Sequence, residues 1–361
     1  MRVRSKILSL ILLLSLTLFS GGTNAQSDAV QNRKRPKIVN PSTPAQPSSR
    51  QNVIRPDEPE ADVLRIDTDL VNTVFTAVDR DQHFVTTLRA TDLRIYENDS
   101  AQEISLFERE TSRPLTLAIL VDTSKSQERT LADEKQAAKT FIRSVVRPET
   151  DRVAVVSFTG RPRVDQPLTE KIARLDRAVD LLRVEFPANN PECVEEKSVQ
   201  EDPLCWTSIW DSVWASTNEV LAHSAENSRR AIILLSDGDD TSSTIRRQDA
   251  IESAIKNNVA VYSIGIGDSE TYKVEEDSLR KLSDRTGGRA FFPRSETELR
   301  AAFVQIQEEL RSQYVVAYSP KNKVRDGSRR RIRIEVVNPE LRKRKLQLIY
   351  RQDYYAMERP R

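Results

Sequence analysis

Residues 115–126 read LTLAILVDTSKS, and this stretch decides the fold. Its first part, Leu115 to Val121, is an almost continuous apolar run, which is typical of a β-strand buried on both faces. Its second part, Asp122 to Ser126, is polar. Strands buried on both faces belong to parallel sheets that helices cover on either side. The stretch therefore predicts an α/β domain with a polar loop at the end of one strand.

Strands and helices alternate along the rest of this region. Short apolar runs predict further strands at residues 153–158, 231–235, 259–266 and 290–292. Helical stretches are predicted around them at residues 131–146, 171–182, 208–222, 248–257, 276–286 and 296–311. We expect residues 113–312 to form a doubly wound, mostly parallel sheet with helices on both faces.

The segments on either side of this domain show a different pattern. Residues 63–112 contain stretches of period two, such as residues 71–77, which are separated by turn residues. Residues 313–361 contain another, residues 332–336, whose charged members we expect to face solvent. Because a small β segment has too little core to be stable alone, we expect both segments to form one flanking β unit.

The N-terminal region has the features of an exported protein. Residues 1–25 contain basic residues, then an apolar run, then a small-residue cleavage site before Gln26, which predicts a secretory signal peptide. The apolar run is shorter than the roughly 20 residues that span a membrane, so we expect no transmembrane anchor after cleavage. Residues 26–62 are rich in Pro, Ser and Gln and predict a disordered linker. We therefore expect a secreted or periplasmic protein.

Charge and composition exclude several classes of function. Lys and Arg number 56 and Asp and Glu 54, so the formal charge of +2 gives no net attraction to nucleic acid. Two histidines, His83 and His223, leave little material for a histidine-based zinc site or a Ser-His-Asp triad. The chain has 9 glycines and no glycine-rich phosphate-binding motif. We expect no nucleic-acid partner.

Polar side chains follow two of the predicted strands. Asp122, Ser124 and Ser126 come after the first, and Ser236-Asp237-Gly238 come after residues 231–235. In a doubly wound sheet such loops converge where the strand order reverses, and oxygen ligands from several loops suit hard divalent cations. Ser and Asp after a strand also commonly cap the next helix, and capping explains any one loop taken alone. The two loops together favour a cation site.

The order of these motifs resembles the von Willebrand factor A (VWA) domain, which has a Rossmann-like fold. An Asp-x-Ser-x-Ser motif at a strand end, a threonine four residues before an Asp, and a later Ser-Asp-Gly occur in the family's order. The resemblance implies a metal-ion-dependent adhesion site (MIDAS) at Asp122, Ser124, Ser126, Thr207 and Asp237. The hydroxyls would bind the cation directly, and the aspartates directly or through water. We expect Mg²⁺, with Mn²⁺ and Ca²⁺ as alternatives, and a partner's Asp or Glu carboxylate at the open position.

The flanking segments resemble a narrower group, the bacterial secreted VWA-related proteins that are common in Acidobacteria. Residues 92–99, DLRIYEND, and residues 351–355, RQDYY, carry this resemblance. The chain departs from the family pattern in two places. Residues 189–203 look like an insertion, and Cys205-Trp206 stand where small residues and glycine usually precede the site threonine.

The cysteines and tryptophans near this insertion suggest two further features. Outside the cytoplasm we expect Cys193 and Cys205 to form a disulfide, although two thiols can also bind a metal or act in catalysis. We expect Trp210 and Trp214 to pack in the core. Trp206 lies at the mouth of the loop and is a candidate contact for a partner.

These features predict a metal-dependent protein-binding module that is not an enzyme. One alternative is a structural protein of the cell envelope, whose β segments assemble and whose metal stabilises loops. Another is a phosphotransferase with Asp122 as nucleophile and magnesium at Asp237, Asp239 and Asp240. In that enzyme class a second Asp is the general acid, and Ser124 in its place counts against this alternative.

Overall fold

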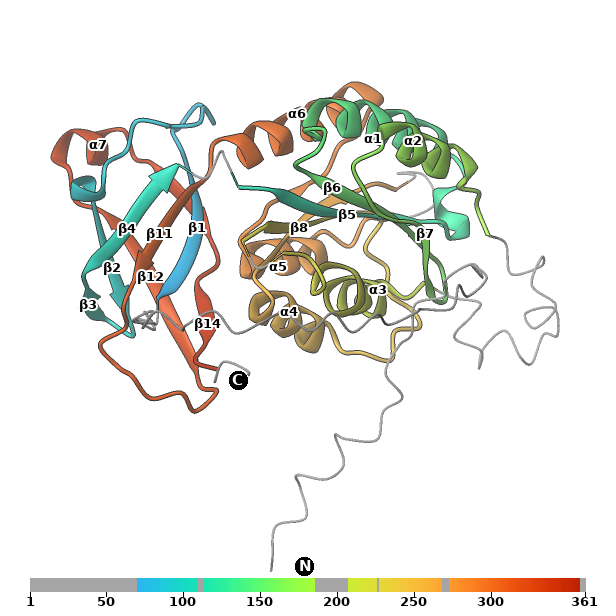
Figure 1. Ribbon diagram of the computed structural model, residues 1–361. Helices are drawn as coiled ribbons and strands as arrows, with labels where there is room; N and C mark the ends of the chain where they lie inside the picture. The colour runs from blue at the N-terminus through green and yellow to red at the C-terminus, as the bar shows by residue number, and fades with distance from the viewer. Residues whose placement is uncertain (1–69, 110–112, 186–206, 226, 268–272, 358–361) are drawn as a thin grey trace, which may run out of the picture. The chain divides into compact units, whose positions relative to one another are not determined.

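The computed structural model describes residues 70–109, 113–185, 207–225, 227–267 and 273–357 (Figure 1). All of them belong to one compact unit, Arg35–Arg361, and the other unit, Met1–Lys34, lies outside the described residues. The predicted signal peptide, linker and disulfide also lie outside them, as does Trp206. No helix in the described part of the chain is long and apolar enough to span a membrane.

A six-stranded sheet lies at the centre of the α/β domain. Its strands are β5 (Leu115–Asp122), β6 (Arg152–Phe158), β7 (Pro162–Thr169), β8 (Arg229–Ser236), β9 (Val259–Gly265) and β10 (Ala290–Phe291). Their order is β10-β9-β8-β5-β6-β7, and all neighbours are parallel except β6 and β7. Because β6 lies on one side of β5 and β8 on the other, the strand order reverses between β5 and β8, the usual place for a ligand site.

Helices cover both faces of this sheet (Figure 1). One face carries α1 (Leu131–Val145), α2 (Ile172–Leu181) and α6 (Glu296–Arg311); the other carries α3 (Ile209–Ala215), the π-helical η6 (Ser216–Leu221), α4 (Arg247–Lys256) and α5 (Glu276–Thr286). In β5, Leu117 and Ile119 pack on the α1 side, whereas Ala118 and Leu120 pack on the α4 side. Burial on both faces explains the continuous apolar run, and each Leu or Ile contributes roughly 1.5–3 kcal/mol.

The N- and C-terminal segments form two four-stranded sheets around a core of their own. One sheet is β13 (Gln347–Tyr350), β1 (Val71–Val78), β11 (Tyr314–Tyr318) and β4 (Ile104–Arg109). The other is β14 (Asp353–Tyr355), β12 (Arg329–Val336), β2 (Leu93–Glu97) and β3 (Ser100–Gln102). The rings of Phe75 and Tyr314 stack in this core with centroids 5.2 Å apart. The predicted fold class, including the flanking β unit, is confirmed.

The differences from the predicted elements are local. β7 is missing from the predicted strands because Pro162 and Pro167 disfavour a strand, and the structure places it at the sheet edge, where proline is tolerated. The predicted helix at residues 208–222 is divided into α3 and η6. The short helices η1 (Ala90–Asp92), η2 (Lys125–Gln127) and α7 (Pro339–Lys343) are additional. Trp210 is buried and Trp214 packs against the same core, as predicted.

Candidate metal centre

The polar loops after β5 and β8 begin side by side. The two strands are parallel neighbours, with Val121 opposite Leu235. Asp122 is the last residue of β5, and Ser236 is the last residue of β8. Because parallel neighbours end at the same edge of a sheet, the two loops leave the sheet together.

Asp122 joins these two loops. Its side chain is fully buried, its Oδ1 accepts the N–H of Ser124 at 2.9 Å, and its Oδ2 accepts the hydroxyl of Ser236 at 2.7 Å. The first bond is typical of an Asx turn, which bends the chain after the strand. The second crosses from one loop to the other. One carboxylate therefore fixes the geometry of both loops.

The remaining members of the cluster lie around Asp122. The hydroxyl oxygens of Ser124 and Ser126 are 3.0 Å apart, and Ser126 hydrogen-bonds to the Asp237 carboxylate. Gln127 donates from Nε2 to Ser126 Oγ at 3.2 Å. The structure thus brings four of the five predicted site residues together, and that they bind a cation stays a prediction. Ser236 and Gln127 support them through hydrogen bonds that the motif does not reveal.

Thr207, the fifth predicted residue, is held by backbone hydrogen bonds of its own and of Ser208 to the loops that follow β8 and β6. Its N–H donates to Thr241 Oγ1 at 2.9 Å, and its carbonyl accepts the N–H of Thr241 at 2.9 Å. The N–H of Ser208 donates to the carbonyl of Thr159, which follows β6, at 2.7 Å. None of the hydrogen bonds of the described residues joins the Thr207 side chain to the other four.

Both carboxylates of the cluster are costly to bury in ionised form. Burial raises the pKa of Asp122 to about 7, and the negative charge of Asp237 adds to the rise. Burial also raises the pKa of Asp237, against the hydrogen bond from Ser126. Within the described part of the chain, no Lys or Arg forms an ion pair with either carboxylate. Carboxylate and hydroxyl oxygens are the donors that hard divalent cations prefer, so the residues fit such an ion.

Two other acidic residues beside these loops have structural roles. Asp240 Oδ1 accepts the N–H of Ile209 at 2.7 Å at the start of α3, and burial raises the pKa of Asp240 to about 6. Asp211 Oδ1 accepts the N–H of Ile245 at 2.7 Å. Asp240, which the phosphotransferase alternative assigns to magnesium, is therefore engaged as a helix cap.

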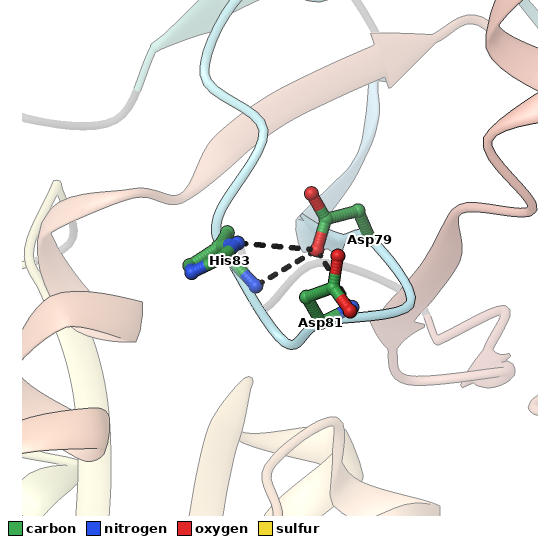
Figure 2. A group of neighbouring side chains, drawn as sticks. All are labelled: Asp79, Asp81 and His83. Carbon is green, nitrogen blue, oxygen red and sulfur yellow. Dashed lines mark hydrogen bonds and ion pairs between the residues drawn. The ribbon is translucent and has the colours of Figure 1, made fainter.

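A separate acidic group lies in the loop after β1 (Figure 2). Potential ligand atoms of Asp79, Asp81 and His83 lie within 4.8 Å of one another. Asp79 Oδ1 accepts the N–H groups of Asp81 and His83, both at 3.0 Å, and His83 Nδ1 lies 3.7 Å from the same oxygen. These local bonds are those of an Asx-type turn. Turn formation thus accounts for the grouping, and Asp81 and His83 are exposed.

Glu134 is a buried acidic residue near the cluster that the sequence analysis misses. It lies in the first turn of α1 and is fully buried. Helical periodicity is the signal that identifies it, because Glu134 stands three residues after Leu131 and four before Ala138, both of which are buried. Because charged residues of a helix are expected to face solvent, the sequence alone does not predict that Glu134 is buried.

Family comparison covers the α/β domain. Two family models of the von Willebrand factor type A domain match the chain, one over residues 117–196 and one over residues 206–306. The first range includes Asp122, Ser124 and Ser126, and the second includes Thr207 and Asp237. No curated protein sequence matches the chain. The narrower bacterial group stays a prediction.

Similar solved structures include proximal thread matrix protein 1 from the mussel byssus, which is 16% identical over 60% of this chain with a TM-score of 0.46. The same protein with a zinc-occupied MIDAS motif is 17% identical with a TM-score of 0.47. The chain spans about half of the length of this mussel protein, 51% and 50% in the two structures.

A von Willebrand factor type A protein from Catenulispora acidiphila is also similar, at 16% identity over 80% of this chain and 73% of that one, with a TM-score of 0.44. BatB from Bacteroides thetaiotaomicron is 16% identical over 54% of this chain and 98% of that one, with a TM-score of 0.39. The two family-model matches begin in β5 and end in α6, and together they include all five predicted metal ligands. The chain therefore belongs to the von Willebrand factor type A domain proteins.

Proposed function

We propose that the VWA domain binds a protein partner through a divalent cation held by Asp122, Ser124, Ser126, Thr207 and Asp237. One observation carries this proposal. Two buried carboxylates, Asp122 and Asp237, meet hydroxyl donors from neighbouring loops, and no Lys or Arg among the described residues neutralises them. Buried carboxylates are unfavourable unless a proton or a cation compensates their charge. Mg²⁺ is the ion we favour, with Mn²⁺ and Ca²⁺ as alternatives.

The bound cation would supply a positive centre with a coordination position open to an anionic ligand. The residues of the chain prepare this position. The bonds from Asp122 to Ser124 and Ser236 hold both loops before any ion arrives, so little ordering remains to be done on binding. We propose an Asp or Glu carboxylate of a protein partner as the ligand. A single contact of this kind is too small to be specific, so the surrounding surface, with Trp206 as a candidate, must add affinity.

The place of action that we propose is outside the cytoplasm. This part rests on the signal-peptide features of residues 1–25, and a disulfide between Cys193 and Cys205 is expected to follow from that location. N-terminal sequencing of the mature protein from its native host, followed by non-reducing peptide mapping, tests both. A mature chain that keeps residues 1–25 contradicts export, and two free thiols contradict the disulfide.

Calorimetric titration of chelator-stripped protein with Mg²⁺ or Mn²⁺ tests the cation site. We expect Asp122→Asn and Asp237→Asn to lose cation binding, because each removes a charged oxygen donor. Asp326→Asn is a matched control, since Asp326 Oδ1 also accepts the N–H of the second residue onward, Ser328, but in an exposed turn. Binding that is unchanged in the first two variants contradicts the assignment.

Partner capture separates the proposed function from its alternatives. The native envelope fraction is passed over immobilised protein with Mg²⁺ and again with chelator. A partner that is released by chelator and is not retained by Asp237→Asn supports metal-dependent recognition. If chelator only lowers the melting temperature and the partner stays bound, the structural alternative is favoured, and phosphatase turnover that Asp122→Asn abolishes favours the enzyme.

A further inference from the structure

Glu134 is a buried carboxylic acid inside the α/β domain without a counter-charge or hydrogen-bond donor among the described residues. Its side chain is fully buried, and neither carboxylate oxygen has a hydrogen-bond partner among the described residues. The hydroxyl of Thr130, one helical turn earlier, donates to Gln127 Oε1 at 3.0 Å. Burying a carboxylate without hydrogen-bond donors lowers the stability of the fold. Glu134 is therefore destabilising unless a group outside the described residues binds it.

Other buried glutamates of the protein have partners. Glu97 accepts hydrogen bonds from Arg330, Tyr318 and Tyr354. Glu309, which is also fully buried, accepts the hydroxyl of Tyr262 at 3.1 Å and lies 3.6 Å from Arg289. The protein therefore pairs buried glutamates in two other places, and the lack of partners at Glu134 calls for a local cause.

The surroundings of Glu134 identify that cause. The hydroxyl of Thr130 donates to Gln127, and Gln127 donates to Ser126, so a chain of hydrogen bonds leads from the N-cap residue of α1 to the candidate metal centre. Burial raises the pKa of Glu134 to about 8, and the negative charges of Asp122 and Asp237 add to the rise. Three buried carboxylates thus share one region of the domain, where a cation would relieve their repulsion.

We propose that Glu134 is a positioning residue of the cation centre, where its carboxylate accepts hydrogen bonds from water bound to the cation. This inference rests on the proposed function, because it requires a cation at Asp122 and Asp237. Water held by a cation is a strong donor, and acceptors behind the direct ligands orient it. Glu134 also supplies a third negative charge near the ion, so the ion is held more tightly than by two aspartates alone.

Titration of the chelator-stripped full chain with Mn²⁺ tests this inference. We expect Glu134→Gln, which keeps the shape and removes the charge, to weaken Mn²⁺ binding by about tenfold, as is usual for supporting residues of metal sites. We also expect its melting temperature in chelator at about pH 9, where the carboxyl of Glu134 is ionised, to equal or exceed that of the wild type, because a repulsive buried charge is gone. Glu309→Gln is the matched control, a buried helical glutamate away from the cluster, and should leave the Mn²⁺ affinity unchanged.

A second variant covers failure of the first to fold. Glu134→Met fills similar space with no polar atom to leave unpaired, and we expect the same loss of affinity. If Glu134 only stabilised the helix, both variants would lower the melting temperature in chelator and leave the Mn²⁺ affinity of folded protein unchanged. That result, with binding still lost in Asp122→Asn, would overturn this inference alone. A wild-type chain that binds neither Mn²⁺ nor Mg²⁺ would overturn the proposed function as well.

Discussion

The β unit and the α/β domain handle buried carboxylates in opposite ways. In the β unit, Glu97 receives hydrogen bonds from Arg330 at 3.1 Å, from Tyr318 at 3.0 Å and from Tyr354 at 2.7 Å. Arg330 and Glu97 are each 3% exposed, so this ion pair is complete inside the protein. At the C-terminal ends of β5 and β8, Asp122 and Asp237 have hydroxyl partners, and no Lys or Arg of the described residues pairs with them.

The difference separates a structural ion pair from a binding site. A complete buried pair holds two segments in register but leaves no charge for a ligand to satisfy. A group of carboxylates without a counter-charge is less stable on its own, and that cost is removed when a cation or a proton binds. Free energy lost in the empty site thus appears as affinity for the ion. Measurements of stability and of cation affinity can test whether the two regions differ in this way.

Breaking the internal pair should have the largest effect. Arg330→Met leaves Glu97 buried without its cation, and we expect the free energy of unfolding to fall by about 3–5 kcal/mol, with or without Mg²⁺. Urea denaturation measures it. Arg331→Met is the control, because Arg331 is the next residue of β12 and is exposed, and it should change stability by less than about 0.5 kcal/mol. Equal losses in the two variants would refute the role of the pair.

Adding the cation should stabilise the wild type and not Asp122→Asn. At a Mg²⁺ concentration near 100 times the Kd, ligand binding stabilises a folded protein by about 2.7 kcal/mol. We expect the wild type and the Asp326→Asn control to show this gain in thermal unfolding, and Asp122→Asn to show none. In chelator, Asp122→Asn should be at least as stable as the wild type. A Mg²⁺ gain that persists in Asp122→Asn places the ion elsewhere.

The pH dependence of the cation-free protein should show the same contrast. Folding raises the pKa of Asp122 from 3.8 to about 7 and that of Glu134 from 4.5 to about 8, chiefly through burial. The folded protein therefore binds protons more tightly than the unfolded chain. The resulting stabilisation is full below about pH 4 and is lost as the pH rises through about 7 to 8.

In chelator we expect the free energy of unfolding to decrease between about pH 5 and about pH 8.5, and saturating Mg²⁺ should remove most of that decrease. Urea denaturation at both pH values, with and without Mg²⁺, measures it. If the decrease in the free energy of unfolding is the same in Mg²⁺ and in chelator, the carboxylates at the C-terminal ends of β5 and β8 do not face the ion.

The exposed acidic turn should give the smallest effect. Asp79→Asn keeps an oxygen that can accept the N–H groups of Asp81 and His83, and we expect stability to change by less than about 0.5 kcal/mol. The Mg²⁺ affinity of the chain should stay the same, as calorimetric titration can show. A weaker affinity in Asp79→Asn would instead mark the turn as a cation site.

Much of the fold, and the grouping of Asp122, Ser124 and Ser126 in one loop, could be predicted from local sequence. The run from Leu115 to Val121 and the polar residues after it are contiguous, so strand and loop can be read together. Arg330 shows where this approach stops. It has the same strand parity as Ile332, which points to the core, but its partner Glu97 is 233 residues away. Burial of a charge depends on such distant partners, and for Glu134 we infer a partner outside the chain.

One feature of the β unit bears on the order in which the chain folds. β1 pairs with β11 and β13, so a strand near the start of the described chain has its partners near its end. The α/β domain, whose strands and helices lie between Leu115 and Arg311, acquires all its own partners earlier during synthesis. Until β11 and β13 have been synthesised, both edges of β1 lack their partner strands, and open strand edges are prone to pair with other chains. A chain ending at Arg311 would keep the complete six-stranded sheet and leave β1 to β4 without the strands that enclose their core.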